Sequence, residues 1–201
     1  MTWRVITYAG RMGRWDPDAR GRLERAALEL FTERGFAETT VPEIAARAGL
    51  TTRTFFRYFK DKREVIFADE DQTRERLVDF VRRAPDGLSP VAMMVVALQE
   101  AAEAVFEPRR DAIRQWRAVV AGDEGLRERA LRKQELMVDA AVSAMHDRGV
   151  DADTADMSAR AAVIVFETAV GTWAEADVAE QPLSHHVRDA FARLRRAVTD
   201  D

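Results

Sequence analysis

The chain has 201 residues, of which 47% are hydrophobic and 33% charged, and it contains no cysteine. This composition is typical of a folded globular protein, and it excludes disulfides, thiolate metal sites and a cysteine nucleophile. The formal net charge is −4, but residues 1–66 carry 13 Lys and Arg against 9 Asp and Glu, whereas residues 67–201 carry 18 against 26. This asymmetry predicts an anionic partner for the first third of the chain.

The sequence contains no candidate membrane span or signal peptide. Its longest apolar run, VAMMVVAL at residues 91–98, is much shorter than the roughly 18 residues that cross a bilayer. Residues 1–15 carry arginines and no acidic side chain, but they lack the continuous apolar stretch of a signal peptide. We therefore expect a cytoplasmic protein with no membrane partner and a basic N-terminal leader over residues 1–15.

Apolar residues recur at helical spacing throughout the chain, and no segment shows the sustained alternation of a β-strand, so an all-α fold is predicted. The first helix is expected to begin at Asp16 and Pro17, an N-cap acid followed by a proline that needs no backbone donor at the first helical position. It is expected to end at Gly35. Its apolar stripe contains Leu23, Ala26, Ala27, Leu30 and Phe31.

Two short helices follow the first one, and a glycine separates them. Thr40 and Glu43 have the spacing of a capping box, which predicts the start of the second helix. Gly49 is expected to supply the left-handed turn that ends it, and Thr51 is expected to cap the third helix. This order of helix, glycine turn and helix is typical of a helix-turn-helix unit, so residues 16–62 are predicted to form a three-helix domain, called the head below.

Residues 63–201, called the body below, are predicted to form a larger helical bundle. Proline and glycine residues divide this region into about six helices, which brings the expected total to about nine. The acidic run at residues 68–72 is interpreted as a solvated helix face. The expected helices lie over residues 63–83, 90–106, 109–121, 125–148, 153–177 and 183–198.

The segment GLTTRTFFRYFKDK, at residues 49–62, contains four aromatic rings and four Lys or Arg side chains. A solvated amphipathic helix and a membrane-surface helix are alternative interpretations of it. The helix-turn-helix unit directly upstream favours DNA, because guanidinium and hydroxyl groups recognise phosphates and base edges. On a helix that begins at Thr52, one side is expected to contain Thr52, Phe55 and Phe59, with Phe56 at its margin. The other side presents Arg53, Thr54, Arg57, Tyr58 and Lys60.

Residues 26–67 contain, in order, the patterns A-x-x-L-F-x-x-x-G-F and T-V-x-x-I-A-x-x-A-G and a capped aromatic helix that ends in Tyr-Phe, with Lys62 before the next helix. In these patterns the segment resembles the DNA-binding region of the TetR family of bacterial transcriptional regulators. The resemblance implies that the third helix enters the major groove of double-stranded DNA and that Thr40 and Lys62 hold phosphates. The matching positions on that helix are Thr52, Arg53, Thr54, Phe56, Arg57 and Tyr58, where Arg53 and Phe56 differ from the small residue and the tyrosine of many relatives.

The resemblance also implies that the body binds a small-molecule effector. Methionine fills irregular apolar space, so four methionines and a tryptophan are candidate ligand contacts, although plain core packing explains each of them singly. These candidates are Met93, Met94, Trp116, Met137 and Met145.

Family members pair their last two helices across a two-fold axis, so the resemblance implies a homodimer. Apolar residues at helical spacing in the last two predicted helices are the candidates for its interface, with Trp173 and Phe191 expected to contribute most. The pattern alone does not separate this arrangement from packing within one chain. The candidates are Phe166, Val170, Trp173, Val187, Phe191 and Leu194.

The sequence has no pattern of an enzyme, a metal site or a cofactor site. His146, His185 and His186 lack partners at metal-ligand spacing, and there is no Gly-rich phosphate loop or nucleophile elbow. The resemblance implies a transcriptional regulator instead, and specifically a repressor that a small apolar or aromatic ligand releases from a palindromic operator. The alternative is a helix-turn-helix interaction adaptor without a small-molecule effector.

Overall fold

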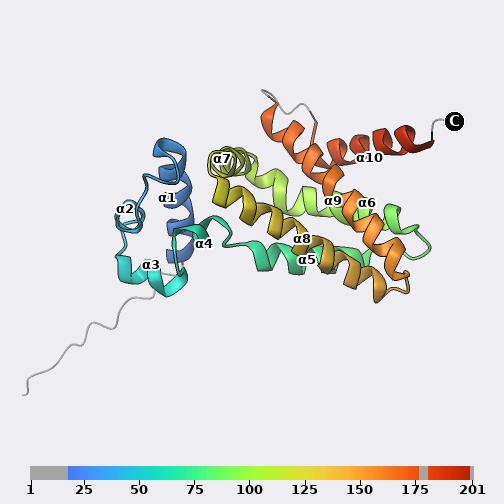
Figure 1. Ribbon diagram of the computed structural model, residues 1–201, viewed down its shortest axis with the longest axis horizontal. Helices are drawn as coiled ribbons and strands as arrows, with labels where there is room; N and C mark the ends of the chain where they lie inside the picture. The colour runs from blue at the N-terminus through green and yellow to red at the C-terminus, as the bar shows by residue number, and fades with distance from the viewer. Residues whose placement is uncertain (1–17, 177–180, 200–201) are drawn as a thin grey trace, which may run out of the picture.

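Within residues 18–176 and 181–199, which the computed structural model describes, all regular secondary structure is helical. The all-α prediction is thereby confirmed. The predicted leader at residues 1–15 and the predicted helix start at Asp16 and Pro17 lie outside the described residues. Figure 1 shows a small group of helices at one end of the molecule and a longer bundle at the other.

The head contains helices α1 (Ala19–Arg34), α2 (Val41–Arg47) and α3 (Thr52–Tyr58). α1 ends where Gly35 adopts a φ of 87°, a left-handed conformation that glycine reaches without steric cost. The apolar stripe of α1 is buried, and both α2 and α3 contact this helix. The buried stripe contains the residues predicted for it, namely Leu23, Ala26, Ala27, Leu30 and Phe31.

Side chains on both sides hold the turn between α2 and α3. The carboxylate of Glu43 accepts hydrogen bonds from the backbone N–H and the hydroxyl of Thr40 at 2.9 and 2.7 Å, so the predicted capping pair is confirmed. Gly49 has a φ of 65°, as expected of the turn glycine. The guanidinium of Arg22 in α1 donates hydrogen bonds to the carbonyls of Ala48 and Gly49. The direction of α3 is therefore tied to α1.

Two buried phenylalanines fix α3 in the head. Thr51 caps the helix by accepting a hydrogen bond from the N–H of Thr54 at 3.1 Å. Phe55 is fully buried and Phe59 is 3% exposed, and their ring centroids lie 5.4 Å apart. The prediction that these rings face inward is confirmed, so the opposite side of α3 is directed to solvent.

Lys62, at the start of α4 (Lys62–Ile66), holds the head together. Its ammonium donates hydrogen bonds to the carbonyls of Phe36, Ala37 and Thr39 at 2.7, 3.1 and 3.0 Å, and it lies over the ring of Phe36. These bonds engage all three N–H donors of the side chain. In this geometry no donor remains for the phosphate contact predicted for Lys62, and the side chain has a structural role instead.

The single helix predicted over residues 63–83 is divided into α4 and α5 (Glu70–Arg83). The carbonyl of Ile66 accepts a hydrogen bond from the indole of Trp116 at 3.1 Å, outside the helical hydrogen-bond pattern. The residue that follows, Phe67, is buried. The turn between α4 and α5 is therefore formed by contacts with a distant helix, which local sequence does not reveal.

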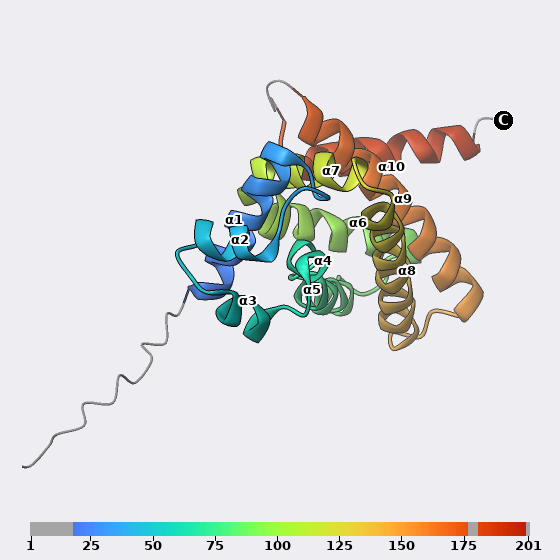
Figure 2. The ribbon, with the colours of Figure 1, turned by 60° about the vertical axis from the view of Figure 1, so that its left-hand side comes forward.

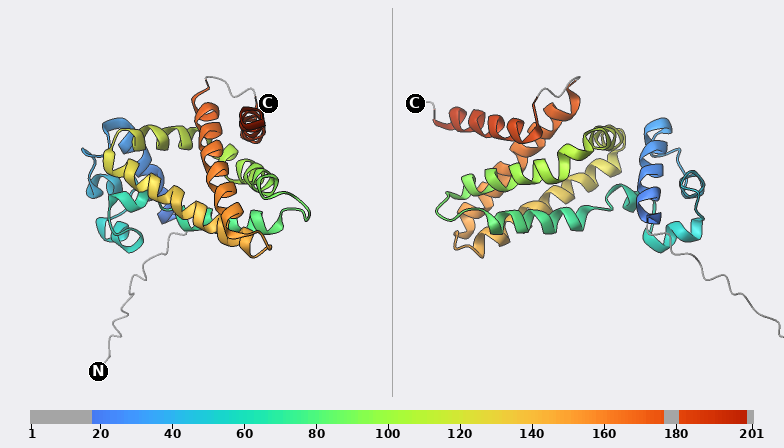
Figure 3. Two further views of the ribbon diagram at one scale, coloured as in Figure 1. Left: turned by 45° about the vertical axis from the view of Figure 1, so that its right-hand side comes forward. Right: turned by 180° about the vertical axis from the view of Figure 1, so that it is seen from behind.

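The body continues with α6 (Pro90–Ala101), α7 (Arg110–Ala121), α8 (Glu124–His146), α9 (Ala152–Glu175) and α10 (Leu183–Thr199). α6 contacts α5, α9 and α10, and α9 contacts α6, α7, α8 and α10. Figure 3 shows α9 crossing the bundle and α10 lying beside it. Between α6 and α7 the chain forms a π-helical segment (Ala102–Phe106) and a 3-10 turn (Glu107–Arg109).

The head and the body share a hydrophobic core. Phe67 from the turn after α4, Val120 from α7 and Leu126 from α8 belong to the same buried cluster as Phe55 of α3. Figure 2 shows α1 lying beside α7, and the two helices are in contact. The predicted domain boundary at residue 62 therefore lies within continuous packing and not in a linker.

Replacing Lys62 by methionine removes the three hydrogen bonds but retains most of the aliphatic side chain over Phe36. We expect Lys62→Met to lower the free energy of unfolding by about 1–3 kcal/mol, because three carbonyls lose a charged donor. Urea unfolding followed by circular dichroism measures this change. Lys60→Met is the matched control, since Lys60 is exposed. Equal loss of stability in the two variants would contradict the structural role of Lys62.

Candidate DNA-binding surface and ligand pocket

The outer side of α3 presents two guanidinium groups and an aromatic ring to solvent. Arg53 and Arg57 are exposed, and Phe56 is 58% exposed although Phe55 beside it is fully buried. Arg53 forms no hydrogen bond or ion pair with any described residue. With Thr54, these side chains line a hollow in the protein surface. Guanidinium groups suit phosphates and guanine edges, and an apolar ring suits the methyl group of thymine.

Arg57 and Tyr58 support each other on this surface. The guanidinium of Arg57 donates a hydrogen bond to the Tyr58 hydroxyl at 3.0 Å and lies 4.8 Å from the centroid of its ring. Tyr58 is half-buried, whereas Thr52 and Lys60 are exposed. Six of the predicted DNA contacts thus lie together on α3 and directly after it: Thr52, Arg53, Thr54, Arg57, Tyr58 and Lys60.

Thr40 lies apart from this group, at the start of α2. Its side chain is exposed, but its hydroxyl donates a hydrogen bond to Glu43. The hydrogen bonds from the Thr40 hydroxyl and backbone N–H lower the pKa of the Glu43 carboxyl. The phosphate contact of Thr40 stays a prediction.

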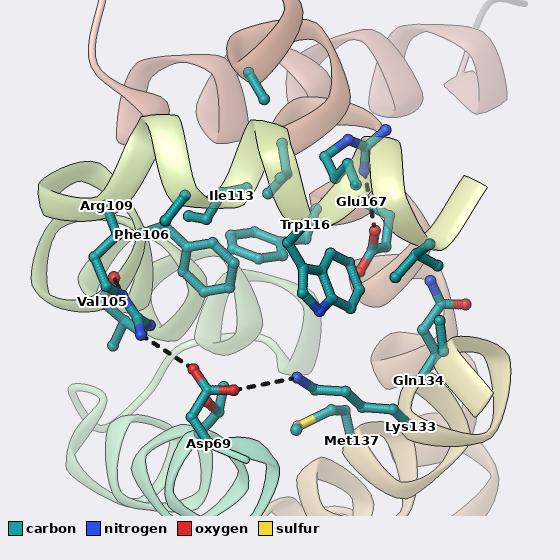
Figure 4. Close-up of a pocket in the computed structure, with 18 of the residues that line it drawn as sticks. Asp69, Val105, Phe106, Arg109, Ile113, Trp116, Lys133, Gln134, Met137 and Glu167 are labelled. Atoms are coloured by element: carbon teal, nitrogen blue, oxygen red, sulfur yellow. Dashed lines mark hydrogen bonds and ion pairs between the residues drawn. The ribbon is translucent and has the colours of Figure 1, made fainter. Parts of the chain in front are cut away.

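A cavity of about 740 Å³ lies between the head and the helices of the body. Much of its wall is apolar, and Figure 4 shows Phe106, Ile113 and Trp116 on it. The rings of Phe106 and Phe166 meet edge to face with their centroids 5.0 Å apart. Two of the predicted ligand contacts, Trp116 and Met137, line the cavity. Its size and apolar wall are typical of a small-molecule site.

The other three predicted ligand contacts do not line this cavity. Met93 is 4% exposed, and Met94 and Met145 are fully buried. All three belong to the main hydrophobic core of the body. Plain core packing, the alternative interpretation of these methionines, therefore describes their positions.

One carboxylate and two cations face one another at the cavity wall. Asp69 lies 3.1 Å from the guanidinium of Arg109 and 3.9 Å from the ammonium of Lys133 (Figure 4). The next residue, Glu70, is only 8% exposed and pairs with an arginine of α8 at 3.3 Å. The interpretation of residues 68–72 as a solvated face therefore fails for Asp69 and Glu70, which pair with cations of distant helices, whereas Asp71 and Gln72 are exposed.

Trp116 connects the cavity with the turn between α4 and α5. Its indole N–H donates to the carbonyl of Ile66, and its ring meets Phe67 edge to face with centroids 6.0 Å apart. The ammonium of Lys133 lies 5.8 Å from the centroid of the Trp116 ring. Sequence reasoning found Trp116 but not its polar neighbours, because those residues come from separate helices with no shared pattern.

Most of the predicted dimer contacts are buried within a single chain. They fill the space between α9, α10 and α6 and belong to the main core of the body. Packing within one chain, the open alternative, therefore describes them. Leu194 is half-buried, and the buried residues are Phe166, Val170, Trp173, Val187 and Phe191.

The outer side of α9 carries apolar residues that sequence analysis did not select. Met157 is 73% exposed and Ile164, seven residues later, is 68% exposed. Val198 near the end of α10 is also 73% exposed. These positions were missed because inward-facing and outward-facing apolar stripes both recur at helical spacing.

The histidines do not form a metal site. His146 is exposed, and His185 and His186 are half-buried in the first turn of α10. Burial, with a further effect of neighbouring His185, lowers the pKa of His186. Among the described residues no cluster of His, Asp and Glu is suited to hold a metal ion, and no described helix is long and apolar enough to cross a membrane.

The sequence of the head matches a known family. The profile described as "Bacterial regulatory proteins, tetR family" matches residues 24–68. The transcriptional regulator TcmR of Streptomyces glaucescens is 37% identical over 75 residues, which cover 37% of this chain and 33% of TcmR, so the chain matches about a third of the length of that relative. The transcriptional activator FasR of Mycolicibacterium smegmatis is 26% identical over 165 residues, which cover 80% of this chain and 74% of FasR.

Similarity of structure extends into the body. The crystal structure of Thermus thermophilus FadR, a TetR family transcriptional repressor in complex with lauroyl-CoA, has a TM-score of 0.56 at 25% identity, over 88% of this chain and 93% of FadR. The relatives named here are regulators and not enzymes. The profile match over residues 24–68, the helix-turn-helix geometry and the similarity of fold to FadR together support a regulator of the TetR family.

Proposed function

We propose that this protein is a DNA-binding repressor, which occupies a palindromic operator as a homodimer and leaves it when a small molecule enters the cavity. The outer side of α3 is the observation that carries DNA binding. Arg53, Phe56 and Arg57 are exposed there, on a helix whose inner side is fixed by buried rings. The family and the cavity support the repressor role and the control by a ligand.

α3 suits the major groove, which is wide enough to admit one α-helix. Arg53 extends from the helix without a partner among the described residues, so its guanidinium is available to a guanine edge or a phosphate. Phe56 offers an apolar contact for a thymine methyl group. Because residues 1–66 carry 13 Lys and Arg against 9 Asp and Glu, this first third of the chain also attracts the phosphate backbone irrespective of sequence.

A palindromic site requires a symmetric protein, and α9 and α10 offer a surface for a second copy. The exposed side chains of Met157 and Ile164 form an apolar stripe on α9, and Val198 adds to the exposed apolar surface on α10. Pairing of these helices removes that surface from water. The proposed interface therefore uses the outer residues, while the residues predicted from sequence hold α9 and α10 to their own chain.

The cavity of about 740 Å³ is the proposed effector site. Its apolar wall, with the paired rings of Phe106 and Phe166, supports a ligand with a large apolar part. FadR, which shares 25% identity with this chain, is a repressor in complex with lauroyl-CoA, a ligand that carries an acyl chain. FasR, in contrast, is an activator. Release of the operator on ligand binding is the result expected of a repressor, and it distinguishes repression from activation.

Trp116 supplies a route from the cavity to DNA. A ligand that displaces this side chain breaks its hydrogen bond to Ile66 and changes the position of α4, which begins in the head at Lys62. In a dimer the two copies of α3 must lie about 34 Å apart to enter successive turns of the groove. A small tilt of α4 is therefore sufficient to lower operator affinity, provided that the ligand prefers the tilted state.

The alternative is an adaptor whose helix-turn-helix unit contacts a protein and which has no effector. The unpartnered guanidinium of Arg53, together with the positive net charge of residues 1–66, favours DNA. Binding to short duplexes that weakens steeply with salt is expected of the regulator and not of the adaptor.

Arg53→Ala is expected to weaken binding to the preferred operator by about 1–3 kcal/mol if Arg53 contacts a base, and an Arg53→Ala, Arg57→Ala double variant by more. An operator selected by the wild-type protein from random duplexes allows the measurement by fluorescence anisotropy. Arg132→Ala on α8 is the control, because it removes the same charge from an exposed position in the body. Unchanged affinity of the double variant would refute the proposed α3 surface.

Ile164→Asp is expected to convert the homodimer into a monomer of 22.7 kDa, since it places a charge within the apolar stripe of α9. Light scattering after size-exclusion chromatography at micromolar concentration measures the mass. Val91→Asp is the control, because Val91 is 43% exposed on α6. A monomeric wild-type protein, or a dimeric Ile164→Asp variant, would rule out this interface.

Trp116→Phe retains an aromatic ring but removes the N–H that binds Ile66. A ligand found by a thermal-shift screen of apolar metabolites is expected to bind this variant as it binds the wild-type protein. The factor by which the ligand lowers operator affinity is expected to be about 2- to 10-fold smaller in the variant. Titration of the operator with and without ligand gives this factor. Trp173→Phe is the control, since Trp173 is buried in the core of the body. An unchanged factor in Trp116→Phe shows that the coupling takes another route.

A further inference from the structure

The cavity wall is more positive than the region that surrounds it. Residues 67–201 carry 18 Lys and Arg against 26 Asp and Glu. The wall, in contrast, contains six Lys and Arg against four Asp and Glu. A positive wall inside an acidic region attracts a negatively charged ligand. The wall cations are Arg76, Arg109, Arg114, Arg117, Arg127 and Lys133.

Lys133 has donors that no described residue uses. Its side chain is only 19% exposed, yet its ammonium forms no hydrogen bond there. The contacts of this ammonium are with Asp69, at 3.9 Å, and with the ring of Trp116. A largely buried ammonium is costly unless an anion both pairs with it and accepts its hydrogen bonds. The position beside Lys133 therefore favours an anionic oxygen at shorter distance.

Arg109 faces the same position from the other side, as Figure 4 shows. Its Nε donates to the carbonyl of Val105 at 2.9 Å, which fixes the direction of the guanidinium. Its Nη1 donates to Asp69 at 3.1 Å. A single carboxylate thus serves two cations, and it is closer to one than to the other.

We propose that the effector is an anionic amphiphile, in which a carboxylate or phosphate is joined to an apolar chain. Its anionic group takes the place of the Asp69 carboxylate between Arg109 and Lys133, and its chain lies against Phe106 and Phe166. The arrangement provides two charge-assisted hydrogen-bond donors at one end of an apolar cavity, which matches both parts of such a molecule.

Displacement of Asp69 has a structural consequence. Asp69 directly precedes α5, and its backbone carbonyl accepts the N–H of Thr73 in the first turn of that helix. A ligand that displaces the Asp69 side chain therefore acts directly before α5, at the turn that Trp116 also contacts. This inference rests on the proposed effector function of the same cavity, and it adds the chemical class of the ligand and the residue that the ligand replaces.

Calorimetry of the full chain without DNA tests the ligand class with three probes of equal chain length: decanoate, decyl phosphate and decan-1-ol. Both anions are expected to bind at least about 10-fold more tightly than the alcohol. Lys133→Gln is expected to remove most of this difference without changing the affinity for the alcohol. Arg132→Gln, with the same charge loss at the neighbouring exposed position, is the control.

Asp69→Asn is expected to raise the affinity for decanoate several-fold, because the internal competitor loses its charge. A gain of affinity does not arise from misfolding, so this variant complements Lys133→Gln. Asp71→Asn is its control, since Asp71 is exposed on the same turn of α5. The affinities of decanoate and decyl phosphate are then compared. The probe that binds more tightly indicates whether the anionic group of the ligand is a carboxylate or a phosphate.

Equal affinity for decan-1-ol and the anions, no binding of any probe, or unchanged anion affinity in Lys133→Gln would each overturn this inference. Loss of anion binding in Arg117→Gln instead of Lys133→Gln would refute the assigned position. Operator binding, measured separately, tests the proposed function. If an anion binds and operator affinity does not change, effector control is refuted but the ligand class is not. If decan-1-ol alone releases the operator, effector control is supported and the ligand class is overturned.

Discussion

The indole of Trp116 donates a hydrogen bond to the carbonyl of Ile66 at the turn where the chain passes from the head into the bundle. On the head side of this turn, Phe67 is buried in the core that also contains the inner rings of α3. On the bundle side, Asp69 pairs with two cations of the cavity wall. The position of α3 and the shape of the cavity are therefore not independent, because the same few residues hold both.

On α3, the side chains that stabilise the head and the side chains directed to solvent lie on different sides of the helix. Phe55 lies in the core and Phe56, one position later, is 58% exposed, although the two rings are chemically identical. The inner rings anchor the helix in the core, whereas Arg53, Phe56 and Arg57 on the outer side remain exposed. Lys62 shows the converse, because a cation in a DNA-binding segment serves three carbonyls of its own domain.

The body combines two kinds of surface that its acidic composition does not suggest. Cations from α7, α8 and the turn before α7 meet at the cavity, where low polarity strengthens their interaction with any anion that enters. On the outside, α9 presents exposed apolar side chains that are unfavourable in water. The proposed ligand site and the proposed dimer surface thus both involve α9, but they use different residues of that helix.

The sequence alone determined the helices, the helix-turn-helix unit and the inward side of α3, because capping residues, glycine turns and helical periodicity act over a few neighbouring positions. It also identified Trp116 and Met137 as candidates for a cavity that they do line. Only the tertiary structure showed that Asp69 faces Arg109 and Lys133, that three candidate methionines are core residues, and that most of the predicted dimer contacts are buried within one chain. These facts depend on which neighbour packs against each side of a helix. Helical periodicity predicts that a face is apolar, but it does not predict which other helix covers that face.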